Sequence, residues 1–429
     1  MTRIPITIFS LLAITGLAIA DDWPHYNGAD STRTTDEAIG ETNWSGSGPR
    51  KVWSAEANTG FSSFTIAGGM AFEMSQREID GLDQEICIAR DAMTGEEIWA
   101  APLSIFRLDN GGGNAGTNDN KGGDGPRTTP TYFDGHVYTL TAEMALHCLD
   151  AKTGDEVWSV DILRNYDGRN IKWENAASPL VYDGKVYAYG GGKGKSMMCF
   201  DAKSGDEVWA DHDYMMTHAT PIIANIHDTP QIIFFTQAGL VSLDPDKGDE
   251  LWMAEFPFKV STAASPVVAG NIVYCAAGYG VGSAAFEISK SGSSFKAKEI
   301  WRLEGNEPVT NHWSTPVHRD GYLYGMFSFK LYGDGPVKCV ELKTGKVMWE
   351  EEGFGPGNVI LTGSGLLALS DSGEVALIEP TPEKYNELGR FKAVGGKCWS
   401  TPTLANGHIY VRSTTEAACF DVSGKTAAR

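Results

Sequence analysis

The sequence predicts an all-β protein, an eight-bladed β-propeller built from four-stranded antiparallel blades. Three observations predict it: a turn motif that recurs at blade spacing, a hairpin motif that precedes it, and a strand that is missing at one end of the chain and present at the other. The 429 residues include 50 glycines and 12 tryptophans. This composition suits a repeat fold with many tight turns and one packing tryptophan in each repeat.

The turn motif has the form Asp-x-x-Ser/Thr-Gly-x-x-x-Trp. Two nearly identical copies run from Cys148 to Trp158 and from Cys199 to Trp209. Successive motif tryptophans lie 43 to 59 residues apart, which is the length of a four-stranded blade. We expect the aspartate to accept backbone N–H groups, the glycine to take a positive φ, and the tryptophan to pack between neighbouring sheets. The other copies end at Trp99, Trp252, Trp301 and Trp349.

A second motif precedes each turn motif. It consists of Ser or Thr, then Pro, a strand, an Asp-Gly or Asn-Gly turn and another strand, which predicts a β-hairpin. Proline suits the first residue of a strand that need not donate a hydrogen bond there. Six clear copies begin at Thr129, Ser178, Thr220, Ser265, Thr315 and Thr401, and diverged copies begin near Phe64 and Gly357. Eight hairpins predict eight blades.

The two ends of the chain are expected to share one blade. The last hairpin is followed by a turn that ends at Gly424 without a tryptophan strand, and the missing strand lies around Trp53. Phe391 stands where a seventh tryptophan is expected. Sharing would close the ring and remove a free sheet edge. The predicted divisions are a signal peptide (1–20), an N-terminal arm (21–49), the propeller (50–424) and a C-terminal tail (425–429).

The first twenty residues have the pattern of a secretory signal peptide. Arg3 gives a positive start, residues 4–20 are almost wholly apolar, and Ala18 and Ala20 form a small-x-small cleavage site. We predict cleavage after Ala20 and a location in the periplasm or outside the cell. The alternative is an N-terminal membrane anchor. No later stretch is long and apolar enough to predict a membrane span.

Charge and cysteine content exclude some classes of function. The formal net charge is −20, and nucleic-acid binding requires basic clusters, so we expect no nucleic-acid partner. The seven cysteines include no Cys-x-x-Cys pair, and five of them fall at nearly the same repeat position, where they would point into different blades. We therefore predict small buried apolar residues, not disulfides or a metal site.

The repeats resemble the tryptophan-docking motifs of the pyrroloquinoline quinone (PQQ)-like β-propellers over roughly residues 50–424. That family includes quinoprotein dehydrogenases and also non-enzymatic propellers, such as the scaffold lipoprotein of the outer-membrane β-barrel assembly machinery. Its dehydrogenases carry adjacent cysteines and calcium ligands near the quinone. This sequence has no adjacent cysteines and no Cys-x-x-Cys-His haem site. The resemblance therefore implies PQQ and Ca²⁺ as cofactors only if the protein is an enzyme.

Residues just before each inner strand are expected to line the mouth of the central channel. Arginine, histidine, tryptophan and asparagine at corresponding turns would bind a planar or anionic ligand through charge-assisted hydrogen bonds and stacking. The alternative is that these residues fill and hydrate the channel entrance. The candidates are Arg127, Trp173, Asn175, His218, His312, Trp313, Lys397 and Trp399. No catalytic residue and no metal ligand is assigned.

One long irregular stretch, residues 108–126, is rich in glycine, asparagine and aspartate. Its oxygen-bearing side chains suit Ca²⁺, but the spacing differs from that of an EF-hand. A surface loop that covers the channel mouth is the preferred interpretation.

The sequence favours an exported, non-catalytic propeller that acts as a binding scaffold for an envelope protein or a small ligand. The reason is that the repeats account for a complete propeller, whereas no set of residues typical of a catalytic site is recognisable. Two alternatives stay open. One is a PQQ-dependent quinoprotein oxidoreductase acting on alcohols or sugars, and the other is a polysaccharide-binding module, which the tryptophans at the channel mouth would suit.

Overall fold

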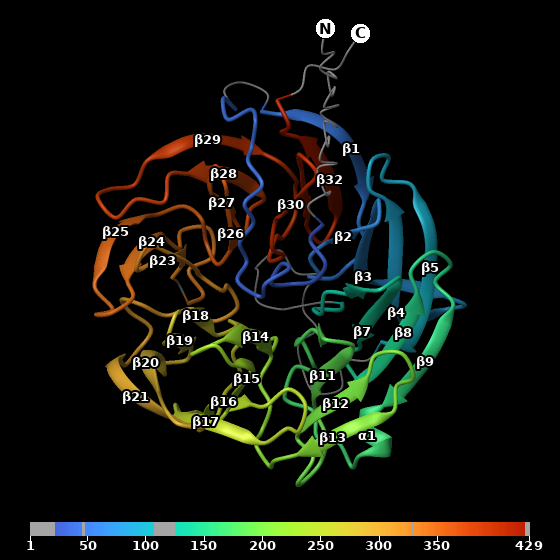
Figure 1. Cartoon of the computed structure of the whole chain (residues 1–429). Coiled ribbons are helices and arrows are strands. Elements are labelled where there is room, and N and C mark those ends of the chain that lie inside the picture. The colour runs from blue at the N-terminus through green and yellow to red at the C-terminus, as the bar shows by residue number, and fades with distance from the viewer. Residues whose placement is uncertain (1–21, 45–47, 107–124, 328, 425–429) are drawn as a thin grey trace, which may run out of the picture.

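The computed structural model describes residues 22–44, 48–106, 125–327 and 329–424. These residues form eight four-stranded antiparallel sheets around a central channel, which confirms the predicted eight-bladed propeller (Figure 1). Within each blade the strands follow one another from the channel to the rim. The predicted signal peptide and the tail at 425–429 lie outside the described residues.

Seven blades are continuous in sequence. The first three are β2–β5 (Thr65–Ala67, Met70–Ile79, Leu82–Asp91, Glu97–Ile105), β6–β9 (Thr131–Phe133, His136–Leu140, Ala145–Asp150, Glu156–Asp161) and β10–β13 (Leu180–Tyr182, Lys185–Tyr189, Met197–Asp201, Glu207–Asp211). The next four are β14–β17 (Ile222–Asn225, Pro230–Thr236, Gly239–Leu243, Glu250–Glu255), β18–β21 (Val267–Ala269, Ile272–Ala277, Gly282–Ser291, Ser294–Leu303), β22–β25 (Val317–Arg319, Tyr322–Met326, Val337–Glu341, Val347–Glu351) and β26–β29 (Asn358–Thr362, Gly365–Leu369, Glu374–Ile378, Glu387–Lys392). A short helix, α1 (Ile162–Asn165), follows β9. In the part of the chain that the structure describes, no helix is long and apolar enough to cross a membrane.

The eighth blade, which we call the closing blade, contains strands from both ends of the described chain. It consists of β30 (Thr403–Ala405), β31 (His408–Arg412), β32 (Glu416–Asp421) and, at the rim, β1 (Arg50–Glu56). Strand β1 pairs antiparallel with β32 and places Trp53 opposite Cys419. The predicted sharing of one blade by the terminal strands is confirmed, and it leaves no break in the ring.

The motif tryptophans join each blade to the next. The indole N–H of Trp99 donates to the backbone carbonyl of Ala151 at 3.0 Å, in the turn that follows β8. The carboxylate of Asp150 accepts backbone N–H bonds from Lys152 and Thr153 at 2.9 and 3.0 Å, which holds the turn in the shape that the indole covers. The same docking onto a carbonyl of the next blade is made by Trp53, Trp158, Trp209, Trp301 and Trp349.

The glycine of each turn leaves room for the indole. Gly154 has a φ of +77°, and a Cβ at this position would lie 2.7 Å from carbons of the Trp99 ring. Gly135, in a hairpin turn, has a similar φ of +79°, but a Cβ there would meet nothing within 4 Å. Alanine substitutions at the two positions therefore separate the cost of backbone strain from the cost of a steric clash with the indole ring.

Replacing Gly154 with alanine is expected to destabilise the protein more than replacing Gly135 with alanine. Both variants carry the penalty of a positive φ, about 1–2 kcal/mol. Gly154→Ala adds about 1–3 kcal/mol because the new methyl group overpacks against Trp99. Urea unfolding of the two variants measures the difference, and equal losses would contradict a tight docking of the indole.

Two blades depart from the motif. Strands β20 and β21 are ten residues long and join in a plain hairpin, so Trp252 has no Asp-x-x-Thr-Gly turn to dock on. Its indole N–H donates instead to the side chain of Gln231 at 2.6 Å. Phe391 occupies the tryptophan position of β29. A Cβ on Gly48 would lie 2.6 Å from Cβ of Phe391, so this glycine covers the phenylalanine as the turn glycines cover the indoles.

A Ser or Thr before the inner strand of seven of the eight blades links neighbouring blades. The backbone N–H of Thr129 donates to the hydroxyl of Ser178 at 2.8 Å, and the N–H of Ser178 donates to the hydroxyl of Thr220 at 3.0 Å. Ser63 donates in the same way to Thr129, Ser265 to Thr315, and Thr401 to Ser63. We call these seven residues the hydroxyl belt. It explains why Ser or Thr, and not an apolar residue, precedes the proline.

All seven cysteines are buried and unpaired, as the repeat analysis predicts. Four of them lie directly opposite a motif tryptophan on the neighbouring strand, where a small apolar side chain fits beside the indole. These are Cys148, Cys199, Cys339 and Cys419.

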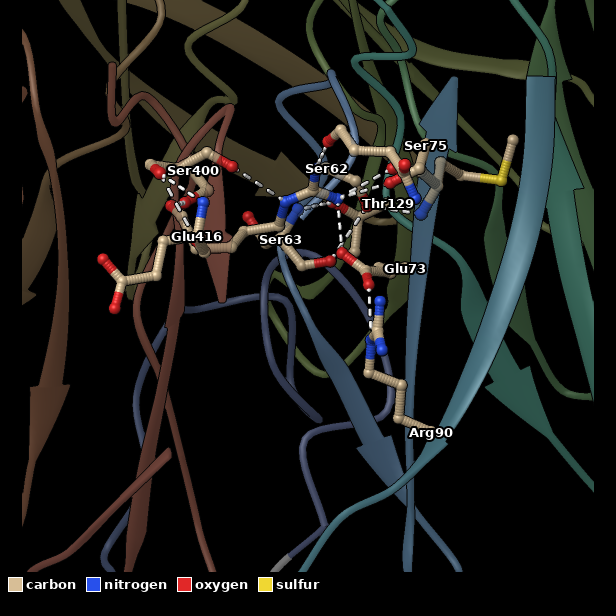
Figure 2. Close-up of polar contacts among 12 residues, drawn as sticks. Ser62, Ser63, Glu73, Ser75, Arg90, Thr129, Ser400 and Glu416 are labelled. Carbon is tan, nitrogen blue, oxygen red and sulfur yellow. Dashed lines mark hydrogen bonds and ion pairs between the residues drawn. The ribbon is translucent and has the colours of Figure 1, made fainter. Parts of the chain in front are cut away.

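A buried ion network holds the closing blade to the blade β2–β5 (Figure 2). Glu73 on β3 is fully buried between two arginines: Arg90 Nε donates to Oε1 at 2.9 Å, and Arg412 Nη1 lies 2.5 Å from Oε2. Arg412 belongs to β31 and also donates to the carbonyl of Met74 at 2.9 Å and to the hydroxyl of Ser75 at 3.2 Å. The network therefore spans the seam at which the ring closes.

Candidate ligand-binding site at the channel mouth

The residues two positions before the hydroxyl belt all line one cavity at the mouth of the channel. Each blade of a propeller places equivalent residues at an equivalent height, so a single repeat position forms a ring of side chains. The belt residues fix this height because they connect the blades. The seven lining residues at this position are Phe61, Arg127, Ala176, His218, Ala263, Trp313 and Trp399.

This cavity, the mouth cavity, has a volume of about 250 Å³. Thr220 of the belt and Tyr26 of the N-terminal arm also line it. The other lining residues come from loops or stand beside the ring position: Trp173, Tyr279, His312, Lys330 and Tyr332. Six of the eight candidate site residues therefore come together here: Arg127, Trp173, His218, His312, Trp313 and Trp399.

The other two candidates lie behind the lining. Asn175 is buried, its Oδ1 accepts the backbone N–H of Ala177 at 3.0 Å, and its Nδ2 donates to the carbonyl of Ala177 at 3.1 Å. Lys397 is 8% exposed, and its Nζ lies 5.4 Å from the ring centre of Trp399. Asn175 thus shapes a loop, and Lys397 backs a wall residue.

Aromatic rings form one wall of the mouth cavity. Trp399 stacks on Phe61 with ring centres 4.8 Å apart, and it lies nearly parallel to Tyr332 at 6.0 Å and 5.0 Å from Trp313. The indole N–H of Trp313 donates to the carbonyl of Pro356 at 2.8 Å. The indole N–H of Trp399 is buried and finds no hydrogen-bond partner among the described residues.

The mouth cavity carries positive charge. Arg127 and Lys330 line it, whereas no aspartate or glutamate of the described residues does. The Arg127 guanidinium donates to the carbonyl of Trp173, and Lys330 Nζ lies 4.6 Å from the ring centre of Tyr279. Since the whole chain carries a net charge of −20, this cationic lining is a local feature that favours an anionic ligand.

The two histidines of the cavity are neutral. Burial, together with the nearby charge of Arg127, lowers the pKa of His218 to about 3. Burial and the charge of Lys330 likewise lower the pKa of His312 to about 3. His218 Nε2 donates to the carbonyl of Glu174 at 2.7 Å. The positive charge of the site therefore resides on the arginine and the lysine.

The loop that carries Trp173 has a strained backbone. Trp173 and Glu174 both hold positive φ angles, +72° and +60°. Such angles cost about 1–3 kcal/mol each in residues other than glycine and are often found at binding sites. Arg127 binds the Trp173 carbonyl, and Asn170 Nδ2 donates to Glu174 Oε2 at 2.7 Å, so both residues of the strained pair are held by side chains.

Asp371 positions two parts of the aromatic wall. Its buried carboxylate accepts the N–H of Gly333 at 2.9 Å, which fixes the loop that carries Tyr332. Its backbone carbonyl accepts the N–H of Cys398 at 2.9 Å, next to Trp399. One residue in the turn between β27 and β28 therefore holds wall residues from two other blades.

Sequence reasoning missed several lining side chains. Phe61 could have been found, because it stands two residues before Ser63, at the ring position that the clear repeats define. Tyr26 belongs to the arm, and Tyr279, Lys330 and Tyr332 belong to loops between strands, where no repeat constrains the residue type.

The structure also bears on metal binding. Among the described residues, no three or more His, Cys, Asp and Glu side chains are arranged to hold a metal ion. Most of the stretch at 108–126, which the sequence offered as a Ca²⁺-binding or channel-covering loop, lies outside the described residues.

A family model described as outer membrane protein assembly factor BamB matches residues 82–351, more than half of the chain. The chain belongs to this family. The resemblance of the repeats to PQQ-like propellers is thereby confirmed. Solved structures of BamB and of quinohemoprotein dehydrogenases share the propeller, so membership in the BamB family leaves the choice between scaffold and enzyme to the site itself.

Two curated proteins match this BamB-family chain in sequence. The quinoprotein ethanol dehydrogenase of Pseudomonas aeruginosa is 30% identical over 137 residues, which are 29% of this chain and 22% of that protein. The uncharacterized protein RP232 of Rickettsia prowazekii is 24% identical over 278 residues, 62% of this chain and 61% of that protein. The chain thus spans less than two thirds of the length of each.

Solved structures agree with the fold of the BamB family. Quinohemoprotein alcohol dehydrogenase from Comamonas testosteroni superposes with a TM-score of 0.67 and 14% identity, over 95% of this chain and 82% of that one. BamB from Moraxella catarrhalis superposes with a TM-score of 0.59 and 15% identity, over 87% of this chain and 99% of that one. At such identities the likeness establishes the fold alone.

Proposed function

We propose that the protein is an exported, non-catalytic propeller that binds a small planar anion in the mouth cavity. The make-up of the cavity carries the proposal: aromatic walls, two cationic side chains, two neutral histidines and, among the described residues, no carboxylate. Aromatic walls bind flat faces by stacking, and cations bind carboxylates through charge-assisted hydrogen bonds. The signal-peptide pattern of residues 1–20 supports export.

The lining also supports a binding role over a catalytic one. A general base works best when its pKa lies near the working pH, and the pKa values of both histidines, His218 and His312, are about 3. The lining that the structure describes holds no cysteine, aspartate or glutamate that could act as a nucleophile or proton carrier. The groups present are suited to holding a ligand.

Binding of a flat dianion tests the proposal. Naphthalene-2,6-dicarboxylate should bind the wild-type protein and quench its tryptophan fluorescence, whereas naphthalene-2,6-dimethanol, which has the same ring system and no charge, should bind more weakly. Replacing Arg127 or Lys330 with methionine should weaken binding of the dicarboxylate about 10- to 100-fold, the value of one charge-assisted hydrogen bond.

Arg164→Met is the matched control, because the Arg164 side chain is 87% exposed and lies on α1, away from the cavity lining. This variant should bind like the wild type. Equal affinities for the dicarboxylate and the dimethanol, or no effect of either lining substitution in folded protein, would contradict an anion site.

Membership in the BamB family favours a second candidate, a scaffold that contacts envelope proteins. The model that matches is named for an outer membrane protein assembly factor. Co-purification of envelope proteins with the wild type, unchanged in the Arg127→Met and Lys330→Met variants, would support this role and would place the contact surface outside the mouth cavity.

A PQQ-dependent oxidoreductase is the enzymatic alternative, because one stretch of the chain matches a quinoprotein ethanol dehydrogenase. The lining fits PQQ itself, a flat molecule with carboxylates, through the aromatic walls, Arg127 and Lys330. It does not fit Ca²⁺, which takes about 6–8 oxygen ligands and prefers carboxylates, because no described carboxylate lines the cavity. The protein should therefore bind PQQ, but in the presence of PQQ, Ca²⁺ and an alcohol it should not reduce a redox dye. Reduction of the dye would establish that the protein is an enzyme.

A further inference from the structure

Residues 22–44, which are most of the predicted N-terminal arm (21–49), enter the central channel and then return to the rim, where β1 follows (Figure 1). Trp23 forms an antiparallel bridge with Ile66 of β2, and Thr34 forms a parallel bridge with Leu361 of β26. The arm therefore adds to the inner edges of two different blades. Between these two bridges it crosses the channel.

Arg33 anchors the arm at the centre of the ring. It is 1% exposed, and its guanidinium donates to the carbonyl of Thr315 at 3.2 Å, to Oδ1 of Asn358 at 3.1 Å and to the hydroxyl of Thr401 at 2.7 Å. The acceptors come from three blades, and Thr315 and Thr401 belong to the hydroxyl belt. Asn27 of the arm reaches a fourth blade, because its Nδ2 donates to the belt hydroxyl of Ser265 at 3.2 Å.

The arm also lies between two cavities. Tyr26 lines the mouth cavity, whereas residues 29–34, including Arg33, line a second cavity of about 560 Å³ together with residues of β14 and β18. The Arg33 guanidinium carbon lies 4.5 Å from the ring centre of Tyr26. Two side chains in contact with each other therefore line different cavities, Tyr26 the mouth cavity and Arg33 the second cavity.

The charge of Arg33 has no acidic partner. Its polar contacts are to neutral groups, and no ion pair joins it to a carboxylate in the described chain. Burial lowers the pKa of the guanidinium, but arginine stays protonated at any ordinary pH. An uncompensated positive charge therefore lies directly behind Tyr26, in a region where water screens it poorly.

We infer that the arm is a built-in stopper that closes the channel and forms the floor of the mouth cavity, and that Arg33 both fixes this stopper and adds a third positive charge to the anion site. The mouth cavity then opens on one face of the propeller only. The part of the inference that concerns the ligand rests on the proposed function, whereas the part that concerns the stopper does not.

Thiol labelling tests the stopper without any ligand. All seven native cysteines are buried, so a cysteine at Ser31, which is 7% exposed on the second-cavity side of the arm, becomes the reporter. The Ser31→Cys variant should react slowly with a charged thiol reagent. Adding Arg33→Met, which keeps an apolar stem and removes the hydrogen bonds, should raise the labelling rate at least tenfold, whereas adding Arg164→Met should leave it unchanged.

Circular dichroism must show that the Arg33→Met propeller is folded. If it is not, Asn27→Ala, which removes fewer contacts of the arm, replaces it and should raise the labelling rate several-fold. An unchanged labelling rate in a folded Arg33→Met or Asn27→Ala protein would overturn the role of the belt contacts in holding the arm.

Ligand binding tests the contribution of Arg33 to the site. The Arg33→Met variant should bind naphthalene-2,6-dicarboxylate at least fivefold more weakly than the wild type, and naphthalene-2,6-dimethanol with little change. Equal weakening for both would show that Arg33 shapes the floor without contributing its charge. If the wild type binds no flat anion, the proposed function fails, but faster labelling in the Arg33→Met protein would still support the stopper.

Discussion

Glutamine in place of Glu73 is expected to lower the free energy of unfolding by about 3–5 kcal/mol, the usual cost of removing one partner from a buried ion pair. Glu73 is fully buried and serves Arg90 and Arg412 at once. The substitution keeps the size of the side chain but leaves two buried guanidinium groups without a negative partner. Because the pair joins β3 to β31, the loss should fall on the seam that closes the ring.

Glu97→Gln is the matched control for this prediction. Glu97 on β5 pairs with Arg77 on β3 at 2.6 Å, in the same blade as Glu73, but both side chains are about one third exposed. Exposed pairs contribute about 0–1 kcal/mol, so this variant should unfold nearly as the wild type does. Chemical denaturation of both variants measures the difference, and a Glu73→Gln protein as stable as Glu97→Gln would show that the buried network contributes nothing to ring closure.

The repeat explains why the fold was predictable. Most blades repeat the same local contacts: an aspartate that binds two backbone N–H groups, a glycine packed against an indole, and a hydroxyl that accepts a hydrogen bond from the neighbouring blade. These are contacts between residues at fixed offsets, so they leave a pattern in the sequence. The ring position two residues before the belt has the same origin, which is why most of the candidate site residues come together.

The unpredicted features depend on contacts that occur once. Arg412 and Ser75 are 337 residues apart in sequence, and neither stands at a motif position that would announce the contact. The docking of Arg33 onto Thr315, Asn358 and Thr401 is likewise unique to the arm. The sequence located the arm but contained no repeat from which its path through the channel could be derived.

Asn175 shows a further limit of pattern reasoning. It stands beside a repeat position and has a side chain suited to ligand binding, yet both of its side-chain groups bind the backbone of Ala177. A side chain that can hydrogen-bond its own loop is difficult to distinguish, from sequence alone, from one that is held ready for a ligand.

Three buried histidines and Glu85 are together expected to lower the free energy of unfolding by about 4 kcal/mol when the pH is lowered from 7 to 5. Three histidines are kept neutral in the folded protein: burial lowers the pKa of His25 to about 4, and the pKa values of His218 and His312 are about 3. In the unfolded chain they titrate near 6.5. Between these values the unfolded state binds more protons, so acid favours unfolding, by about 2 kcal/mol for each histidine at pH 5.

Glu85 opposes this effect in part. Burial raises the pKa of Glu85 to about 7. The backbone N–H of Ala142, which donates to the carboxylate, favours the charged form and offsets part of this rise. The folded protein therefore takes up a proton at Glu85 as the pH falls through 7, before the unfolded chain does. Between pH 7 and pH 5 this uptake stabilises the folded state by about 2 kcal/mol, so the three histidines, which together cost about 6 kcal/mol, leave a net loss of about 4 kcal/mol.

Two substitutions should change this pH dependence in opposite directions. His25→Asn keeps an acceptor for the N–H of Asn27, which His25 Nδ1 accepts at 3.3 Å, and removes one titrating ring. It should reduce the loss between pH 7 and pH 5 by about 2 kcal/mol. Glu85→Gln removes the group that resists acid and should raise the loss to about 6 kcal/mol. Denaturant unfolding at pH 7 and pH 5 measures the two changes. If both substitutions changed the loss of stability in the same direction, the assigned protonation states would be wrong. A neutral buried histidine and a protonated buried carboxyl group predict opposite dependences of the unfolding free energy on pH.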